Sequence, residues 1–167
     1  GGTIGDYQNV LFLEAVRMIK FKQPNDVLLV LVSYVPSIGG GGTELKTKPT
    51  QHAVRFLNSV GLHPDMVIAR AQVPLDEKRK EKLEFMVGLE HGSVISAPDV
   101  KNIYEIPLNF EKDHVGDKIA KKFGLSAKKK DLSEWVGLLK KIQRIQSELH
   151  IGIVGKYFSS GDFALED

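Results

Sequence analysis

Short apolar runs alternate with amphipathic stretches along this chain, and that alternation limits its possible folds more than any other feature. The runs at 26–35, 65–71 and 93–96 are rich in valine, isoleucine or leucine, which is typical of strands buried on both faces of a sheet. A helical pattern follows each run after a connection. Because strands that alternate with helices pair in parallel, the sequence predicts an α/β fold, a three-layer arrangement with helices on both faces of a parallel sheet.

The helical stretches show the spacing of amphipathic helices. Within 10–20, apolar residues recur three or four positions apart. A second helix is expected to begin at Pro49, where proline loses no needed hydrogen bond, and to end with Gly61 as its C-terminal cap. The other expected elements are a mobile glycine loop at 37–43, a helix at 75–87 with Leu83 and Met86 facing inward, a short helix through Tyr104, helices at 115–123 and 132–143, and a final strand at 149–154.

Composition excludes several classes of protein. The 23 basic and 21 acidic residues leave a net charge of +2, too even for a nucleic-acid-binding surface or a polybasic membrane anchor. There are no cysteines, hence no disulfides, and the five histidines lack the spacing of metal ligands. The longest apolar run, 27–32, is far shorter than a membrane span, and the chain opens without a signal-peptide pattern. We therefore expect a cytoplasmic domain with no nucleic-acid or membrane partner, and a solvated surface run at Lys128–Lys130.

The densest group of candidate binding residues lies where a loop meets the second helix. Free amides and the positive end of the helix dipole favour an anion there, lysines add charge, and hydroxyls add donors. This combination suits a triphosphate. A solvated basic loop before a proline-started helix would have the same composition, so the residues alone leave both interpretations open. The group consists of Lys46, Thr47, Lys48, Pro49, Thr50 and Gln51.

A glycine-rich turn at 1–6 precedes the first helix. It resembles phosphate-approach loops, but no Gly-Lys-Ser/Thr follows it, so it is not a Walker A motif. Asp6 either contacts a ligand or caps the helix through its side chain. Because ligands of open α/β sheets bind at the carboxyl ends of the strands, we expect segments 1–8, 37–51 and 96–100 to build any site.

Several blocks of sequence, in the right order and spread over most of the chain, together resemble CTP synthase (glutamine-hydrolysing). The resemblance is to a fragment that covers most of the amidoligase (synthetase) domain and the start of the glutaminase domain, with both ends of the chain cut. It implies a dethiobiotin-synthetase-like, P-loop-type fold that lacks its N-terminal part. The blocks are Gly1–Asp6, Phe12–Ala15, Lys46–Gln51, Ile95–Pro107, Leu132–Trp135 and Ile151–Tyr157.

The resemblance also implies a division of the chain. Residues 1–131 would be the C-terminal portion of the amidoligase domain, and 132–148 a linker helix and connection. Residues 149–167 would be the first strand of a truncated class I glutaminase domain.

The activity implied by the resemblance is that of an ATP-dependent C–N ligase. ATP phosphorylates the 4-oxygen of UTP, and ammonia then displaces phosphate to give CTP. The ammonia comes from glutamine in a separate domain that GTP activates. The family's P-loop and Mg²⁺-binding carboxylates would lie upstream of position 1, and the glutaminase residues beyond position 167. We therefore expect a part of a longer homotetrameric enzyme that is inactive alone.

Carried over position by position, the resemblance assigns two nucleotide sites. The strip at 46–51 and Lys82 would bind UTP and its product CTP, which acts as a feedback inhibitor. Without the resemblance, Lys82 is one solvated lysine of a charged helix, and Asp99 is a helix cap. The other implied site residues are Asp6, Tyr7 and Gln8 for the same nucleotide, at an interface between subunits, and Asp99 and Val100 for the adenine of ATP.

Two departures from the family pattern concern the UTP and CTP site. The sequence has Asp6-Tyr7-Gln8 where the family usually has Asp-Ile-Glu, and the lost acid removes a charged acceptor. The glycine run at 39–42 is also longer than the family pattern. Two alternatives remain: a stand-alone triphosphate-binding regulatory module without catalysis, and a nucleic-acid-binding domain that uses Lys128–Lys130, against which the near-neutral charge argues.

Overall fold

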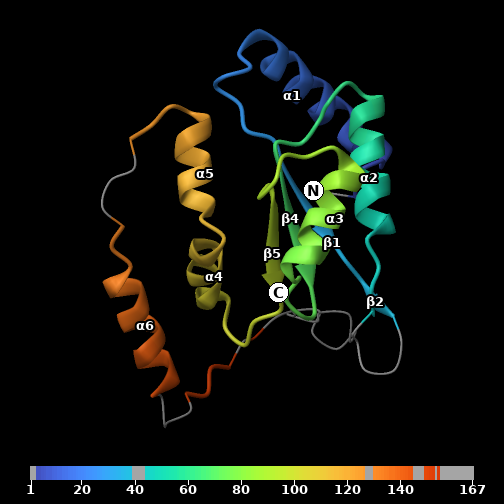
Figure 1. Ribbon diagram of the computed structural model, residues 1–167. Coiled ribbons are helices and arrows are strands. Elements are labelled where there is room, and N and C mark those ends of the chain that lie inside the picture. The colour runs from blue at the N-terminus through green and yellow to red at the C-terminus, as the bar shows by residue number, and fades with distance from the viewer. Residues whose placement is uncertain (1–2, 39–43, 127–129, 145–148, 153, 155–167) are drawn as a thin grey trace. The chain divides into compact units, whose positions relative to one another are not determined.

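The computed structural model describes residues 3–38, 44–126, 130–144, 149–152 and 154 (Figure 1). The chain divides into two compact units, Gly1–Leu132 and Ser133–Asp167. The second unit contains the helix α6 (Ser133–Gln143), close to the predicted 132–143. The glycine run at 39–42, Lys128, Lys129 and most of the predicted glutaminase segment lie outside the described residues.

A parallel sheet organises the first unit. Its strands are β1 (Val30–Tyr34), β4 (Met66–Ala71) and β5 (Val94–Pro98), in the order β1-β4-β5. Between β1 and the second helix lies a short antiparallel pair, β2 (Ser37–Ile38) and β3 (Glu44–Leu45), which the sequence did not predict. The predicted α/β class with a parallel sheet is confirmed.

Helices α2 (Lys48–Ser59) and α3 (Glu77–Val87) pack on one face of this sheet. They bury Val54, Leu57, Leu83 and Val87 against alternate residues of β4, namely Val67, Ala69 and Ala71. The 3₁₀ turn η1 (Tyr7–Asn9) leads into α1 (Val10–Lys22), which adds Leu13 and Val16 to the same core.

The other face of the sheet is covered by α4 (Ile106–Lys112) and α5 (Val115–Lys122), which follow the 3₁₀ turn η2 (Ile103–Glu105). Val115 and the half-buried Phe110 pack there against Met66 and Ile95. Period-two alternation therefore sends successive β4 residues to two different cores, and helices cover both faces as predicted. The helix α4 was not predicted as a separate element.

Local signals place the ends of two helices. Gly61 has φ +77° just after α2, and Gly88 has φ +75° just after α3, a backbone conformation that glycine adopts without strain. The Asp76 carboxylate accepts a hydrogen bond from the Arg79 N–H at 2.8 Å and caps the start of α3. The predicted role of Gly61 is confirmed.

Three expectations were wrong. β1 is an edge strand of the described sheet, and Val32 and Tyr34 are 60% and 53% exposed, because the second core extends over β5 and β4 but not over this end of β1. Met86 is 47% exposed, since its side chain lies beside the buried stripe that contains Leu83. Residues 149–152 and 154 form no strand.

Candidate functional site

The segments that follow the three strands meet at the carboxyl edge of the sheet. Tyr34 pairs with Arg70, and Arg70 with Ala97, so the strands end side by side. Beyond them, the Ser37 hydroxyl donates to the Gln72 side-chain oxygen at 2.6 Å. Two of the three segments expected to build a site, 37–51 and 96–100, therefore begin at one edge.

The two lysines of the strip at 46–51 differ in their surroundings. The Lys46 N–H donates to the Pro36 carbonyl at 2.8 Å, and its ammonium forms an ion pair with Glu44. The hydrogen bond from Lys46 lowers the pKa of the Glu44 carboxyl. Lys48, the first residue of α2, is exposed and makes no ion pair or side-chain hydrogen bond within the described part of the chain. Lys48 is thus the available cation at the start of the helix.

The remaining strip residues face in two directions. The Gln51 amide nitrogen lies 3.0 Å from the Thr47 hydroxyl and 3.1 Å from the sulfur of Met86 on α3. Thr50 is fully buried, with its hydroxyl 2.8 Å from that of Ser33 on β1. The strip thus presents its lysines outward, whereas the Thr50 hydroxyl is directed into the core rather than toward a ligand.

Lys82 lies on α3, four residues before Met86. Because residues four apart share a helix face, Lys82 is on the side of α3 that carries the Gln51 contact. Its side chain is exposed and has no ion pair or hydrogen bond among the described residues. This position is compatible with a second lysine near the strip.

The turn at 3–8 has a structure of its own. The Asp6 carboxylate accepts the Thr3 N–H at 3.0 Å and makes no capping bond to the helix that follows. Gly5, with φ +108°, lies against Phe56 of α2, while Tyr7 is 83% exposed and Gln8 is exposed. Asp6 closes the turn, so the interpretation as a helix cap is wrong. No hydrogen bond or ion pair joins this turn to the strip at 46–51 in the portion of the chain described.

Asp99 follows β5 at the same edge. Its N–H donates to the Ala71 carbonyl at 2.9 Å, and its carboxylate lies 3.3 Å from the Arg70 guanidinium. The cap of η2 is Asn102, whose side chain accepts the Tyr104 N–H, so the alternative of Asp99 as a helix cap is wrong. Val100 beside it is half-buried.

Sequence reasoning missed three polar residues of this edge: Glu44, Arg70 and Gln72. Arg70 carried a signal, since it is the charged residue at the end of the apolar run of β4. Glu44 and Gln72 carried none, because their contacts depend on how the loops fold back over the strand ends.

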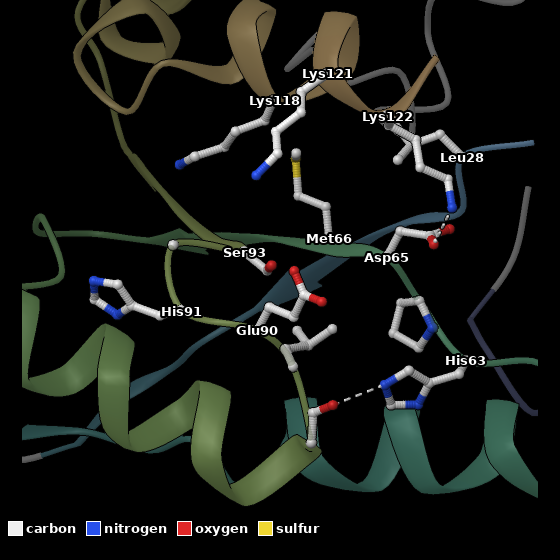
Figure 2. A pocket seen from close by; sticks show the side chains of 14 residues that line it. Leu28, His63, Asp65, Met66, Glu90, His91, Ser93, Lys118, Lys121 and Lys122 are labelled. Atoms are coloured by element: carbon white, nitrogen blue, oxygen red, sulfur yellow. Dashed lines mark hydrogen bonds and ion pairs between the residues drawn. The ribbon is translucent and has the colours of Figure 1, made fainter. Parts of the chain in front are cut away.

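A cavity of about 520 Å³ lies at the opposite, amino-terminal edge of the sheet (Figure 2). Its lining comes from residues just before β4 and β5, from the loop after α3, and from three lysines of α5. Nothing in the sequence pattern indicated it, because its residues come from four separate segments.

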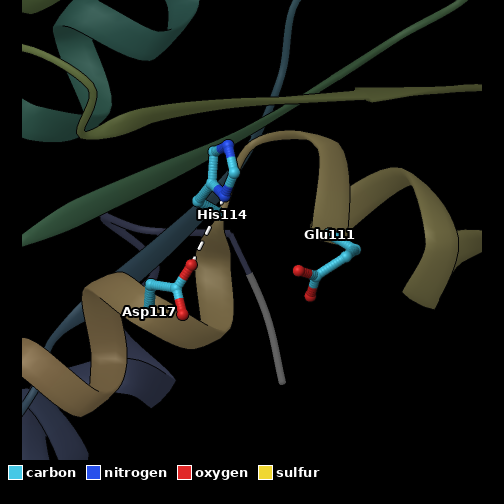
Figure 3. A group of neighbouring side chains, drawn as sticks. All are labelled: Glu111, His114 and Asp117. Carbon is cyan, nitrogen blue, oxygen red and sulfur yellow. Dashed lines mark ion pairs between the residues drawn. The ribbon is translucent and has the colours of Figure 1, made fainter. Parts of the chain in front are cut away.

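A cluster of possible metal ligands lies at the junction of α4 and α5 (Figure 3). Ligand atoms of Glu111, His114 and Asp117 lie within 4.8 Å of one another. The Lys130 ammonium already forms ion pairs with Glu111 and, at 2.6 Å, with Asp117, and its hydrogen bond lowers the pKa of Asp117. The ammonium of Lys130 therefore neutralises both carboxylates in place of a metal ion. Because it is paired in this way, Lys130 does not contribute a free charge to a basic surface patch.

None of the helices among the described residues combines the length and the apolarity that crossing a membrane requires.

Comparisons with known proteins identify the family of this chain. The family described as CTP synthase N-terminus matches residues 1–125. The CTP synthases of Carboxydothermus hydrogenoformans and Methanocaldococcus jannaschii are each 42% identical over 163 residues, which is 97% of this chain and 30% of theirs. That of Pyrococcus abyssi is 40% identical over the same length. The chain belongs to the CTP synthase N-terminus family, and it spans about 30% of the length of these relatives.

The family match corrects the prediction of which region of CTP synthase this chain represents. The chain was expected to cover most of the amidoligase domain and the start of the glutaminase domain. The match is instead to the N-terminal region of CTP synthase, at residues 1–125.

Proposed function

We propose that this chain provides the UTP-binding strip of an ATP-dependent C–N ligase, CTP synthase, which aminates UTP to CTP. Family membership supports the reaction class. The observation that carries the proposal is the position of Lys48, an exposed lysine without an ion pair in the described chain, at the start of α2 near the carboxyl edge of a parallel sheet. Ligands of open α/β sheets bind at this edge.

The strip would hold the triphosphate through two kinds of group. The first-turn amides of α2 and the helix dipole favour an anion, and Lys48 adds a full charge. Lys46 would exchange its partner Glu44 for a phosphate oxygen. Gln51 would orient the strip through its contacts with Thr47 and Met86.

The finer roles rest on the resemblance. Asp6, Tyr7 and Gln8 would reach UTP or CTP across an interface of a homotetramer, and Lys82 would assist the strip. Asp99 and Val100 would meet the adenine of ATP. Because the Asp99 N–H is already bonded to Ala71 and one carboxylate oxygen is paired with Arg70, its remaining oxygens are the groups left for the amino group of the base.

The magnesium ion of such a reaction does not fit the residues described. Mg²⁺ prefers carboxylate and water oxygens, and the one three-residue ligand group in the described part of the chain holds Lys130 instead. We assign no step to the metal. In the intact enzyme, glutamine would supply ammonia under GTP control, within a P-loop-type, dethiobiotin-synthetase-like fold in the cytoplasm. The chain alone would form no CTP from UTP, ATP and ammonia.

The test is Lys48→Ala in the full-length enzyme. Loss of one charged hydrogen bond, worth about 1.5–3 kcal/mol, should raise the KM for UTP about tenfold or more. The matched control is Lys78→Ala, an exposed lysine of α3 outside the strip, which should leave that KM unchanged. An unchanged KM for UTP in Lys48→Ala would reject the proposal.

A further inference from the structure

The cavity at the amino-terminal edge of the sheet contains charged groups that the proposed function does not use (Figure 2). It is lined by the start of β4, the loop before β5 and the side chains of Lys118, Lys121 and Lys122 on α5. Its volume of about 520 Å³ falls in the range of roughly 300–1,000 Å³ that is typical of small-molecule sites. Its position, at the opposite end of the strands from the strip, makes it a separate site.

One acidic residue of the cavity is fully engaged. The Asp65 carboxylate accepts hydrogen bonds from Lys20 at 2.5 Å, from the Leu29 N–H at 2.7 Å and from Lys122 at 3.2 Å. Burial alone would raise the pKa of Asp65, but these hydrogen bonds, led by that of Lys20, lower it. Two ammonium groups share this one carboxylate, so Asp65 cannot neutralise the other lysines.

Two further charges face the cavity without a partner. The Lys121 ammonium and the Glu90 carboxylate make no ion pair or hydrogen bond with any residue that the structure describes, including each other. Figure 2 shows them extending into the cavity from opposite sides. Lys118 donates to the neutral Asp113 carbonyl at 2.6 Å, so its charge is not neutralised there.

These groups specify the chemistry of a ligand. The lysines exceed the acids, and lysine is a phosphate-binding side chain. The Glu90 carboxylate can only accept, so its partner must carry a donor. The lining contains no phenylalanine, tyrosine or tryptophan, and the rings of its two histidines, His63 and His91, already contact other groups of the protein. The ligand should therefore combine a phosphate with hydroxyl groups and need no aromatic ring.

We propose that this cavity binds a phosphate monoester that carries hydroxyl groups, such as a sugar phosphate. Lys118 and Lys121 contact the phosphate, and Glu90 accepts a hydrogen bond from a hydroxyl. This site does not depend on the strip at 46–51.

The test uses the full chain and calorimetric titration with ribose 5-phosphate, ribose and inorganic phosphate. Ribose 5-phosphate should bind, inorganic phosphate should bind more weakly, and ribose should not bind. Lys121→Gln should weaken ribose 5-phosphate about tenfold or more, the effect of one charged hydrogen bond. Glu90→Gln should weaken ribose 5-phosphate but not inorganic phosphate, because the lost acceptor serves the hydroxyl alone.

Two controls make the result decisive. Lys78→Gln, on the exposed side of α3, should bind ribose 5-phosphate as the unchanged chain does. Lys48→Gln removes the free lysine of the strip and should have no effect either. Binding that survives Lys121→Gln, or that is lost in Lys48→Gln, would overturn the proposal. Failure of this site would leave the UTP proposal untouched, since that rests on the KM for UTP of the Lys48 variant.

Discussion

The two proposed sites, at opposite ends of the parallel sheet, would hold an anion by different means. At the carboxyl edge the backbone contributes, because α2 begins there and its first-turn amides and dipole add to Lys48. At the amino edge α2 and α3 end, at Ser59 and Val87, and their dipoles favour cations instead. An anion held there therefore depends on the charges of side chains. One edge can therefore bind with few lysines, whereas the other needs several.

Leu83→Ala should produce the largest effect, and it should disturb both ends. Leu83 is fully buried in the core that joins α2, α3 and the sheet. Removing its side chain should lower the free energy of unfolding by about 2–5 kcal/mol, as measured by urea denaturation. Leu125→Ala, at a residue that is 64% exposed, is the control and should change little. Equal stability of the two variants would contradict the packing described.

Asp65→Asn should act on the amino edge alone. It removes charged hydrogen bonds with Lys20 and Lys122, each worth about 1.5–3 kcal/mol before compensation, so the free energy of unfolding at neutral pH should fall. The folded-state pKa of Asp65 is lowered, so this stability is present above the unfolded pKa of about 3.9 and is lost as the pH falls through the folded pKa.

Stability curves of the parent and Asp65→Asn should therefore converge in acid. The control is Asp26→Asn, whose exposed carboxylate has no partner in the described chain. Curves that stay parallel down to low pH would show that the Asp65 hydrogen bonds do not stabilise the fold.

Glu44→Gln tests whether Glu44 competes with the nucleotide for Lys46 at the carboxyl edge. Glu44 holds the Lys46 ammonium and competes with any phosphate for it. Releasing Lys46 should lower the KM for UTP of the full-length enzyme a few-fold, and Lys46→Ala should cost less than Lys48→Ala, because Lys46 must first leave its partner. A higher KM in Glu44→Gln would mean that Glu44 positions Lys46 rather than competing for it.

Gln8→Glu should give the smallest effect. It introduces, at this exposed position, the acid that the resemblance implies for the family, and a charged acceptor is stronger than a neutral one. CTP inhibition of the full-length enzyme should strengthen a few-fold. Gln23→Glu, at the exposed end of α1, should not change it. Inhibition curves of Gln8→Glu and its parent that overlay would count against a role for the missing charge.

Local patterns predicted most of the elements. The strands β4 and β5 and the helices α2, α3, α5 and α6 lie within a few residues of the positions predicted from hydrophobic spacing and from Pro49 and Gly61. The burial of the Thr50 side chain was also predictable. The spacing of Thr50, Val54 and Leu57 places all three on one face of the helix. Because Thr50 lies within a run of polar residues, it was grouped with the candidate binding residues instead.

Contacts between distant segments could not be predicted. Lys20 reaches Asp65 across 45 positions, and Glu84 of α3 accepts the Val94 N–H of β5 from a buried position. Neither residue type nor spacing distinguishes these side chains from their solvated neighbours. The cavity at the amino edge and the free charge of Lys121 depend on such contacts, so they became visible only in three dimensions.

The hydrogen bond between the hydroxyl groups of Thr50 and Ser33 fixes the rotation of α2 about its own axis. Each residue of an α-helix is turned roughly 100° from the one before it, so Lys48, two positions before Thr50, lies about 200° round the helix and points away from the sheet. A buried threonine thus sets the direction in which the lysine two positions before it can reach.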